Sequence, residues 1–153
     1  MLYPIGIQSF EDIRRGGYVY VDKTELIYKL AATGKYYFLS RPRRFGKSLL
    51  VSTMEAYFQG KKELFEGLAI ASLEKDWVEY PVLHFDLSGA SYTDMEALND
   101  KIGRQLETLE SRFGVVKKYK TFSVRFDNLI ECAFNKTGRQ VVILIDEYDK
   151  PVI

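Results

Sequence analysis

The stretch Arg41-Pro42-Arg43-Arg44-Phe45-Gly46-Lys47-Ser48 decides the fold that we expect for this chain. The apolar run at 36–39 before it is typical of a buried strand, and 47–59 after it has apolar residues at helical spacing. A strand, a loop ending in Gly-Lys-Ser and a helix form the context of a phosphate-binding loop. In such a loop the lysine reaches the β and γ phosphates, the serine holds Mg²⁺, and the helix N-terminus favours anions.

This stretch departs from the strict phosphate-loop consensus at one position, because Arg41 stands where the first glycine is expected. The alternative is an ordinary loop in which Gly46 permits a turn and Lys47 is solvated. The candidate nucleotide-binding residues are Arg44, Phe45, Gly46, Lys47, Ser48 and Leu49.

A second candidate element is the apolar run at 141–145, which ends in Asp146 and Glu147. A continuous apolar run predicts a strand buried on both faces, as in a parallel sheet. Ligands bind at the carboxyl ends of such strands, where Asp146 would help to hold Mg²⁺ and Glu147 would polarise a water for attack on a phosphate. The alternative is that both residues simply leave the core and begin a turn toward Asp149 and Pro151.

The remaining sequence alternates between strand and helix periodicities, which predicts an α/β layered fold. Strands are expected at 18–21, 36–39, 82–87 and 141–145. Helices are expected at 9–15, from Asp22 to a stop at Gly34, and at 47–59, 61–66, 93–113 and 121–136. Glu25 stands three residues after Asp22 and predicts a capping box at the start of the second helix.

Composition excludes several classes of protein. The 153 residues contain 22 Lys and Arg and 21 Asp and Glu, so the chain is not a broadly basic nucleic-acid coat. Cys132 is the only cysteine, so no internal disulfide forms, and His84 is the only histidine, which excludes multi-histidine metal sites within the chain. Neither a signal peptide nor an apolar run of about 18 residues is visible, so we expect a soluble cytoplasmic protein without a membrane span.

Other chemistry-bearing residues have ordinary structural alternatives. Asp86 and Ser88 follow an apolar strand and could approach a nucleotide cleft, or they could form a strand-end turn. The segment 117–120 contains three lysines and could contact nucleic acid, although a solvated loop fits it better. His84 lies in an apolar strand and is expected to be a core or half-core residue, and Cys132 lies in an apolar helical pattern and is expected to be buried.

Four blocks of sequence together resemble one known family. They are Tyr3-Pro4-Ile5-Gly6, Tyr20-Val21-Asp22-Lys23-Thr24, the run from Tyr37 to Ser48, and Leu144-Ile145-Asp146-Glu147-Tyr148-Asp149-Lys150-Pro151. The chain resembles the bacterial and archaeal AAA-ATPase-like proteins that carry a nuclease-like domain of the PD-(D/E)XK type at the C-terminus. The resemblance covers essentially the whole chain, and the missing first glycine is also usual in that family.

The resemblance implies an ATP-binding P-loop module that is ancestrally an Mg²⁺-dependent ATPase. Lys47 would bind the β and γ phosphates, Ser48 and Asp146 would ligate Mg²⁺, and Glu147 would orient water as the catalytic residue. Arg43 and Arg44 match the family block, where they would screen phosphate charge or meet nucleic acid, or would be solvated. The alternatives are a non-catalytic nucleic-acid or protein interaction module, or an inactive fragment of a longer ATPase–nuclease protein.

The resemblance also predicts the domain organisation. Residues 1–35 correspond to a family-specific N-terminal segment, and 36–153 run from the phosphate loop to the Asp-Glu strand of a mainly parallel sheet flanked by helices. Family members continue into a sensor strand, further helices and the nuclease-like domain. We therefore expect either an incomplete sheet or a sheet in which the strand before the phosphate loop pairs directly with the strand that ends in Asp146 and Glu147. Nucleic acid is an expected partner through the nuclease-like domain, and homo-oligomers are expected as well.

Overall fold

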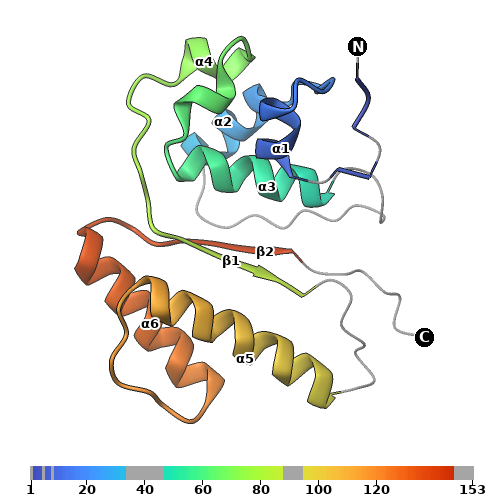
Figure 1. The fold of residues 1–153 in the computed structure, drawn as a ribbon. Helices are drawn as coiled ribbons and strands as arrows, with labels where there is room; N and C mark the ends of the chain where they lie inside the picture. Colours follow the sequence, from blue (N-terminus) through green and yellow to red (C-terminus); the bar gives the residue numbers. More distant parts are fainter. Residues whose placement is uncertain (1, 5, 8, 34–46, 88–94, 147–153) are drawn as a thin grey trace. The chain divides into compact units, whose positions relative to one another are not determined.

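The computed structural model of the chain describes residues 2–4, 6–7, 9–33, 47–87 and 95–146 (Figure 1). The chain divides into two compact units, Met1–Glu79 and Tyr80–Ile153. Within the described residues, the first unit consists of helices, and the second combines helices with a small parallel sheet. None of the described helices combines the length and the apolar composition needed to cross a membrane.

Short helices build the first unit around an aromatic core. They are α1 (Phe10–Arg15), α2 (Thr24–Thr33), α3 (Lys47–Phe58), the 3₁₀ helix η1 (Lys62–Phe65) and α4 (Ala69–Leu73). Helix α1 packs on α3, and α2 packs on α4. Phe10, Phe65 and Ile70 are completely buried, and Ile27 and Leu50 join them in one apolar cluster. This unit therefore has a hydrophobic core of its own.

Asp22 and Thr24 hold the N-termini of two helices, α2 and α4. The Asp22 carboxylate accepts hydrogen bonds from the Thr24 backbone N–H at 2.9 Å, the Thr24 hydroxyl at 2.6 Å and the Ala69 backbone N–H at 2.7 Å. Thr24 is completely buried, and its Oγ1 accepts from the Ile70 N–H at 3.1 Å. These contacts satisfy N–H groups that have no partner within a helix, so this aspartate and threonine have a structural role.

The acid stability of the first unit is expected to depend on Asp22. Burial raises the pKa of Asp22, but hydrogen bonds from Thr24 and Ala69 lower it by more, so this pKa lies below the usual 3.8. A lowered folded-state pKa contributes stability that is present above 3.8 and is lost as the pH falls through the folded-state value. Asp22→Asn should therefore flatten the acid-induced loss of protection in α4, measured by amide hydrogen exchange. Asp76→Asn is the control, and an unchanged pH profile for Asp22→Asn would contradict the assignment.

Two sequence predictions in the first unit are wrong. The strand expected at 18–21 does not form: Tyr18 makes only an isolated bridge with Leu2, and Tyr20 packs edge-on against Phe10 with ring centroids 5.1 Å apart. The expected capping box is also absent, because Glu25 pairs with Lys29 at 3.2 Å. In both places the side chains serve the helical unit, which local propensity does not reveal. The strand expected at 36–39 lies outside the described residues.

The second unit contains β1 (Val82–Asp86), α5 (Met95–Arg112), α6 (Phe122–Thr137) and β2 (Val142–Asp146). The two strands are parallel, and their register runs from Val82 opposite Val142 to Asp86 opposite Asp146. Both helices lie on one side of the sheet in Figure 1. Helix α6 ends at Gly138, whose φ of 68° gives a left-handed cap. The α/β class with parallel strands is thus confirmed.

The exposure of β2 corrects a further prediction. Leu83 and Phe85 of β1 are buried in a cluster with Leu106, Leu109 and Leu129 of the two helices. On β2, however, Ile143 is 38% exposed and Ile145 is 54% exposed. The apolar run at 141–145 is therefore not buried on both faces, because α5 packs mainly on β1.

Candidate functional site

The residues of the expected phosphate loop divide between described and undescribed parts of the chain. Lys47 and Ser48 are the first two residues of α3, as the sequence predicts, and Leu49 follows as a half-buried residue. The first N–H groups of a helix have no partner within it, and its N-terminus is the positive end of the helix dipole. The first turn of α3 contains no acidic residue. Arg44, Phe45, Gly46 and Glu147 lie outside the described residues.

Helix α3 is anchored in the first unit directly after Lys47 and Ser48. Leu50 and Val51 are 6% and 5% exposed, and the Phe10 N–H donates to the Ser52 hydroxyl oxygen at 2.9 Å. The buried Thr53 hydroxyl donates to the Leu49 carbonyl at 2.7 Å. These contacts fix the start of the helix against α1, so its first turn has a defined position within the unit.

Asp146 is the last residue of β2, so it occupies the carboxyl end of a parallel strand. It is only 6% exposed, and its carbonyl accepts a hydrogen bond from the Leu87 N–H at 2.8 Å. Among the described residues, none donates a hydrogen bond to its carboxylate. Ligands of parallel α/β sheets bind at the carboxyl ends of the strands, so the position of Asp146 makes it a candidate cation ligand.

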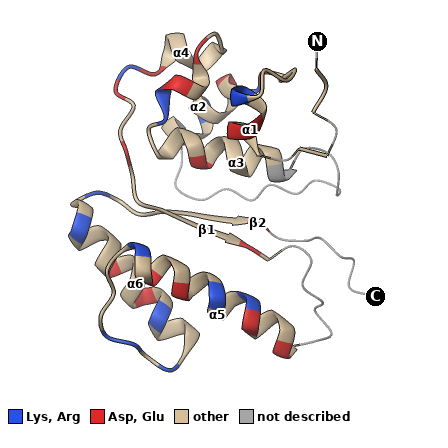
Figure 2. Cartoon of the chain, viewed as in Figure 1, with Lys and Arg blue, Asp and Glu red and all other residues tan. Residues whose placement is uncertain are grey.

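Asp86 ends the neighbouring strand at the same edge of the sheet. It is the register partner of Asp146, it is exposed, and Figure 2 shows the acidic end of β1 in red. Because the two strands are parallel and in register, both aspartates lie on the same face. From the sequence, a strand-end turn and an approach to a nucleotide cleft are both open for Asp86, because nothing local reveals that this residue lies beside Asp146. Ser88 lies outside the described residues.

Gln105 of α5 fixes the backbone of Asp86. The Asp86 N–H donates to Gln105 Oε1 at 2.7 Å, and Gln105 Nε2 donates to the Asp86 carbonyl at 2.7 Å. Since the Leu87 N–H points to β2, the N–H and carbonyl of Asp86 point to the opposite edge of β1. The side-chain amide therefore takes the place of another strand at this point.

The carboxylates at this edge suit Mg²⁺ better than an ion with a full protein cage. Within the described ranges, no group of three or more His, Cys, Asp or Glu side chains could hold a metal ion. Mg²⁺ prefers oxygen ligands, keeps several waters and is usually held by one or two carboxylates together with substrate phosphates. Asp146, with Asp86 beside it, fits that ligand set.

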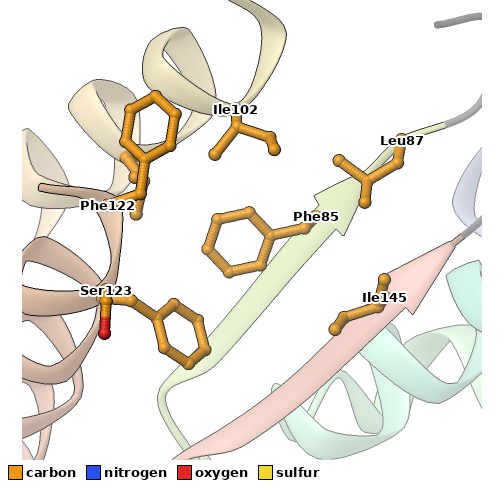
Figure 3. A pocket seen from close by; sticks show the side chains of 8 residues that line it. Phe85, Leu87, Ile102, Phe122, Ser123 and Ile145 are labelled. Atoms are coloured by element: carbon orange, nitrogen blue, oxygen red, sulfur yellow. The ribbon is translucent and has the colours of Figure 1, made fainter. Parts of the chain in front are cut away.

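An apolar pocket of about 280 Å³ opens between the helices and the sheet of the second unit (Figure 3). Its lining residues are Phe85, Leu87, Ile102, Leu106, Phe122, Ser123, Phe126 and Ile145. In Figure 3 the Phe85 ring points from β1 toward the helices that carry Ile102 and Phe122. No residue of this lining titrates, so the pocket offers apolar contact but no acid–base or metal chemistry.

Other residues considered from the sequence lie away from the strand ends. His84 is half-buried, within the range expected for it, whereas Cys132 is half-buried rather than a core residue. Lys117, Lys118 and Lys120 are exposed in the connection between α5 and α6, and Lys117 Nζ lies 5.0 Å from the centroid of the Tyr119 ring. A solvated connection accounts for this basic segment.

Comparison with known proteins identifies the family. The chain is 43% identical over 152 residues to an uncharacterized protein in the vnfD 5′ region of Azotobacter chroococcum mcd 1. The match covers 98% of this chain and 29% of that protein, so the chain spans less than a third of this relative's length. No solved structure matches the chain. The family described as "Predicted AAA-ATPase" matches residues 4–153, and the chain belongs to this family.

Proposed function

We propose that the chain is an ATP-binding module of the P-loop type whose ancestral chemistry is Mg²⁺-dependent ATP hydrolysis. The observation that carries the proposal is the position of Asp146, which is 6% exposed and stands at the carboxyl end of a parallel strand. Family membership supports the same function. Lys47 and Ser48, at the start of α3, are the phosphate and Mg²⁺ ligands of the proposal.

Each residue has a defined chemical role in this proposal. The ammonium of Lys47 neutralises β- and γ-phosphate charge, while the α3 N-terminus supplies backbone N–H donors. The oxygens of Ser48 and Asp146 would hold Mg²⁺, which would offset the charge of the phosphates. Glu147 accepts a proton from the water that attacks the γ-phosphate, and the proton stays on its carboxyl group until solvent removes it.

Nucleotide binding by the complete chain is the direct test. In calorimetry with ATP and Mg²⁺, Lys47→Ala is expected to weaken binding about 10- to 100-fold, because a charge-assisted hydrogen bond contributes about 1.5–3 kcal/mol. Lys62→Ala is the matched control, since it removes an exposed lysine from the same unit. The proposal fails if the unaltered chain binds no nucleotide, or if Lys47→Ala and the unaltered chain bind equally well.

A further inference from the structure

We propose that residues 74–79 form a strap that closes on the C-terminal end of α3 and is released when the Glu74 carboxylate takes up a proton. Trp77 is the part of the strap that moves between a packed and a solvated position. The strap belongs to the first unit and is the last segment of it, since the second unit begins at Tyr80. Its release does not depend on nucleotide binding.

Glu74 fastens the strap to α3. Its Oε2 atom accepts a hydrogen bond from the Tyr57 hydroxyl at 2.5 Å, and its Oε1 atom accepts one from the Asp76 N–H at 3.1 Å. The backbone N–H groups of Lys75 and Trp77 also stabilise the charge of this carboxylate. Because Tyr57 lies in the last turn of α3, one side chain joins the backbone of the strap to the helix.

Trp77 packs onto the end of the same helix. Its ring centroid lies 5.8 Å from that of Tyr57 and 5.1 Å from that of Phe65. Gly60 follows α3 with a φ of 70°, and a Cβ atom at this position would lie 2.9 Å from the Trp77 carbonyl oxygen. The backbone of the strap therefore passes directly over the end of α3, where a glycine permits the close approach.

The closed strap holds Trp77 in an unfavourable state. Its φ of 45° lies in the left-handed region, which a bulky side chain rarely adopts. Its indole Nε1–H is buried and meets no hydrogen-bond acceptor in the described part of the chain. Both costs are relieved when the strap opens, because the backbone relaxes and water reaches the indole nitrogen. Ring packing and the hydrogen bonds of Glu74 therefore have to hold the strap closed.

The charge of Glu74 decides this balance. Burial raises the pKa of Glu74, but hydrogen bonds from the Tyr57 hydroxyl and from backbone N–H groups lower it by more, so this pKa lies below the usual 4.5. A lowered folded-state pKa contributes stability that is present above 4.5 and is lost as the pH falls through the folded-state value. The ionised carboxylate thus closes the strap, and the protonated carboxylate releases it.

Few other titratable groups lie around Glu74. Tyr57 is the titratable side chain that faces it from α3, and α4, which precedes the strap, contains no titratable residue. Lys75 and Asp76 are its neighbours in the strap, and both are exposed. The release is therefore assigned to Glu74 itself.

Opening of the strap would change the connection between the two units. Strand β1 begins at Val82, so only Tyr80 and Pro81 separate the closed strap from the sheet. With the strap open, the whole stretch 75–81 connects α4 and β1. The strap therefore sets the length of chain that is available to connect the two units.

The experiment follows Trp77, the only tryptophan, in the complete chain from neutral pH to about pH 3. Acrylamide quenching of its fluorescence measures its accessibility, while far-UV circular dichroism follows the helices. In the unaltered chain we expect quenching to rise with a midpoint below 4.5 while the circular dichroism is still unchanged. Tyr57→Phe removes one hydrogen bond to the carboxylate and should move this midpoint to higher pH.

Glu74→Gln retains the shape of the side chain but not its charge, so Trp77 should be as accessible at neutral pH as it is in the acid-released unaltered chain. Amide exchange at 75–77 is expected to be on the order of tenfold faster, because charge-assisted hydrogen bonds are roughly twice as strong as neutral ones. Neutral pH also separates this effect from that of Asp22, which stays ionised there. Glu66→Gln, which removes an exposed carboxylate from the same unit, is the matched control.

Either of two results would overturn the inference. One is quenching of Glu74→Gln at neutral pH that equals that of the unaltered chain. The other is acid quenching that rises only together with the loss of the helical circular dichroism, since Trp77 would then report unfolding of the whole unit. Neither result bears on the proposed function, because the strap is released without nucleotide.

Discussion

Arg125→Ala is expected to destabilise the second unit by about 3–5 kcal/mol, because it leaves a buried charge without its partner. The side chain of Glu110 on α5 is 4% exposed, that of Arg125 on α6 is 17% exposed, and the Arg125 Nη2 atom lies 2.5 Å from Glu110 Oε1. The pair joins the two helices that cover the sheet. Urea unfolding gives the loss in stability, and hydrogen exchange in α5 and α6 locates it.

Arg104→Ala is the control for this prediction, since Arg104 is an exposed arginine on α5. The double variant Glu110→Met/Arg125→Met removes both charges and retains apolar volume, so it should recover much of the lost stability. A loss below about 1 kcal/mol for Arg125→Ala, the range of exposed pairs, would show that the pair behaves as a surface salt bridge.

Phe65→Ala is expected to destabilise the first unit by about 3–5 kcal/mol, because it removes a large side chain from a closed core. Phe65 is completely buried, and its ring centroid lies 4.8 Å from that of Phe10 and 5.1 Å from that of Trp77. Denaturant unfolding monitored by tryptophan fluorescence measures this loss directly, since Trp77 is the only tryptophan.

Phe134→Ala is the comparison for Phe65→Ala, because the Phe134 side chain on α6 is 50% exposed and its removal leaves no closed cavity. We expect this variant to lose less than about 1 kcal/mol. Equal losses for the two variants would contradict the packing of the aromatic cluster. Faster hydrogen exchange in α1 and α3 is the local signature expected for Phe65→Ala.

The sequence predicts best those helices and strands whose apolar residues recur at regular spacing on one face. Helix α5 is predicted at 93–113 and runs from Met95 to Arg112, because its apolar residues repeat at helical spacing. The aromatic run at 18–21 has strand propensity but packs beside a helical core, and α4 is too short to show a period. Local pattern fails where tertiary packing decides.

In the candidate site too, local sequence pattern predicts some features, and tertiary packing decides the others. The apolar run before Asp146 predicts the strand end that the structure contains, and Lys47 begins the predicted helix. Nothing in the sequence connects Asp86 with Gln105, because their contact depends on how α5 lies against β1. An isolated glutamine among the polar residues of an amphipathic helix gives no signal of such a contact.

The Gln105 amide also affects the edge of the sheet at which a further strand can be added. By occupying the N–H and carbonyl of Asp86, it removes the pairing groups that a foreign strand would need at that end of β1, which protects the edge against unwanted association. At the level of Asp86, this contact leaves the β2 side of the described sheet for a further strand. Any such addition would then border Asp146, so growth of the sheet and assembly of the ligand site would be the same event.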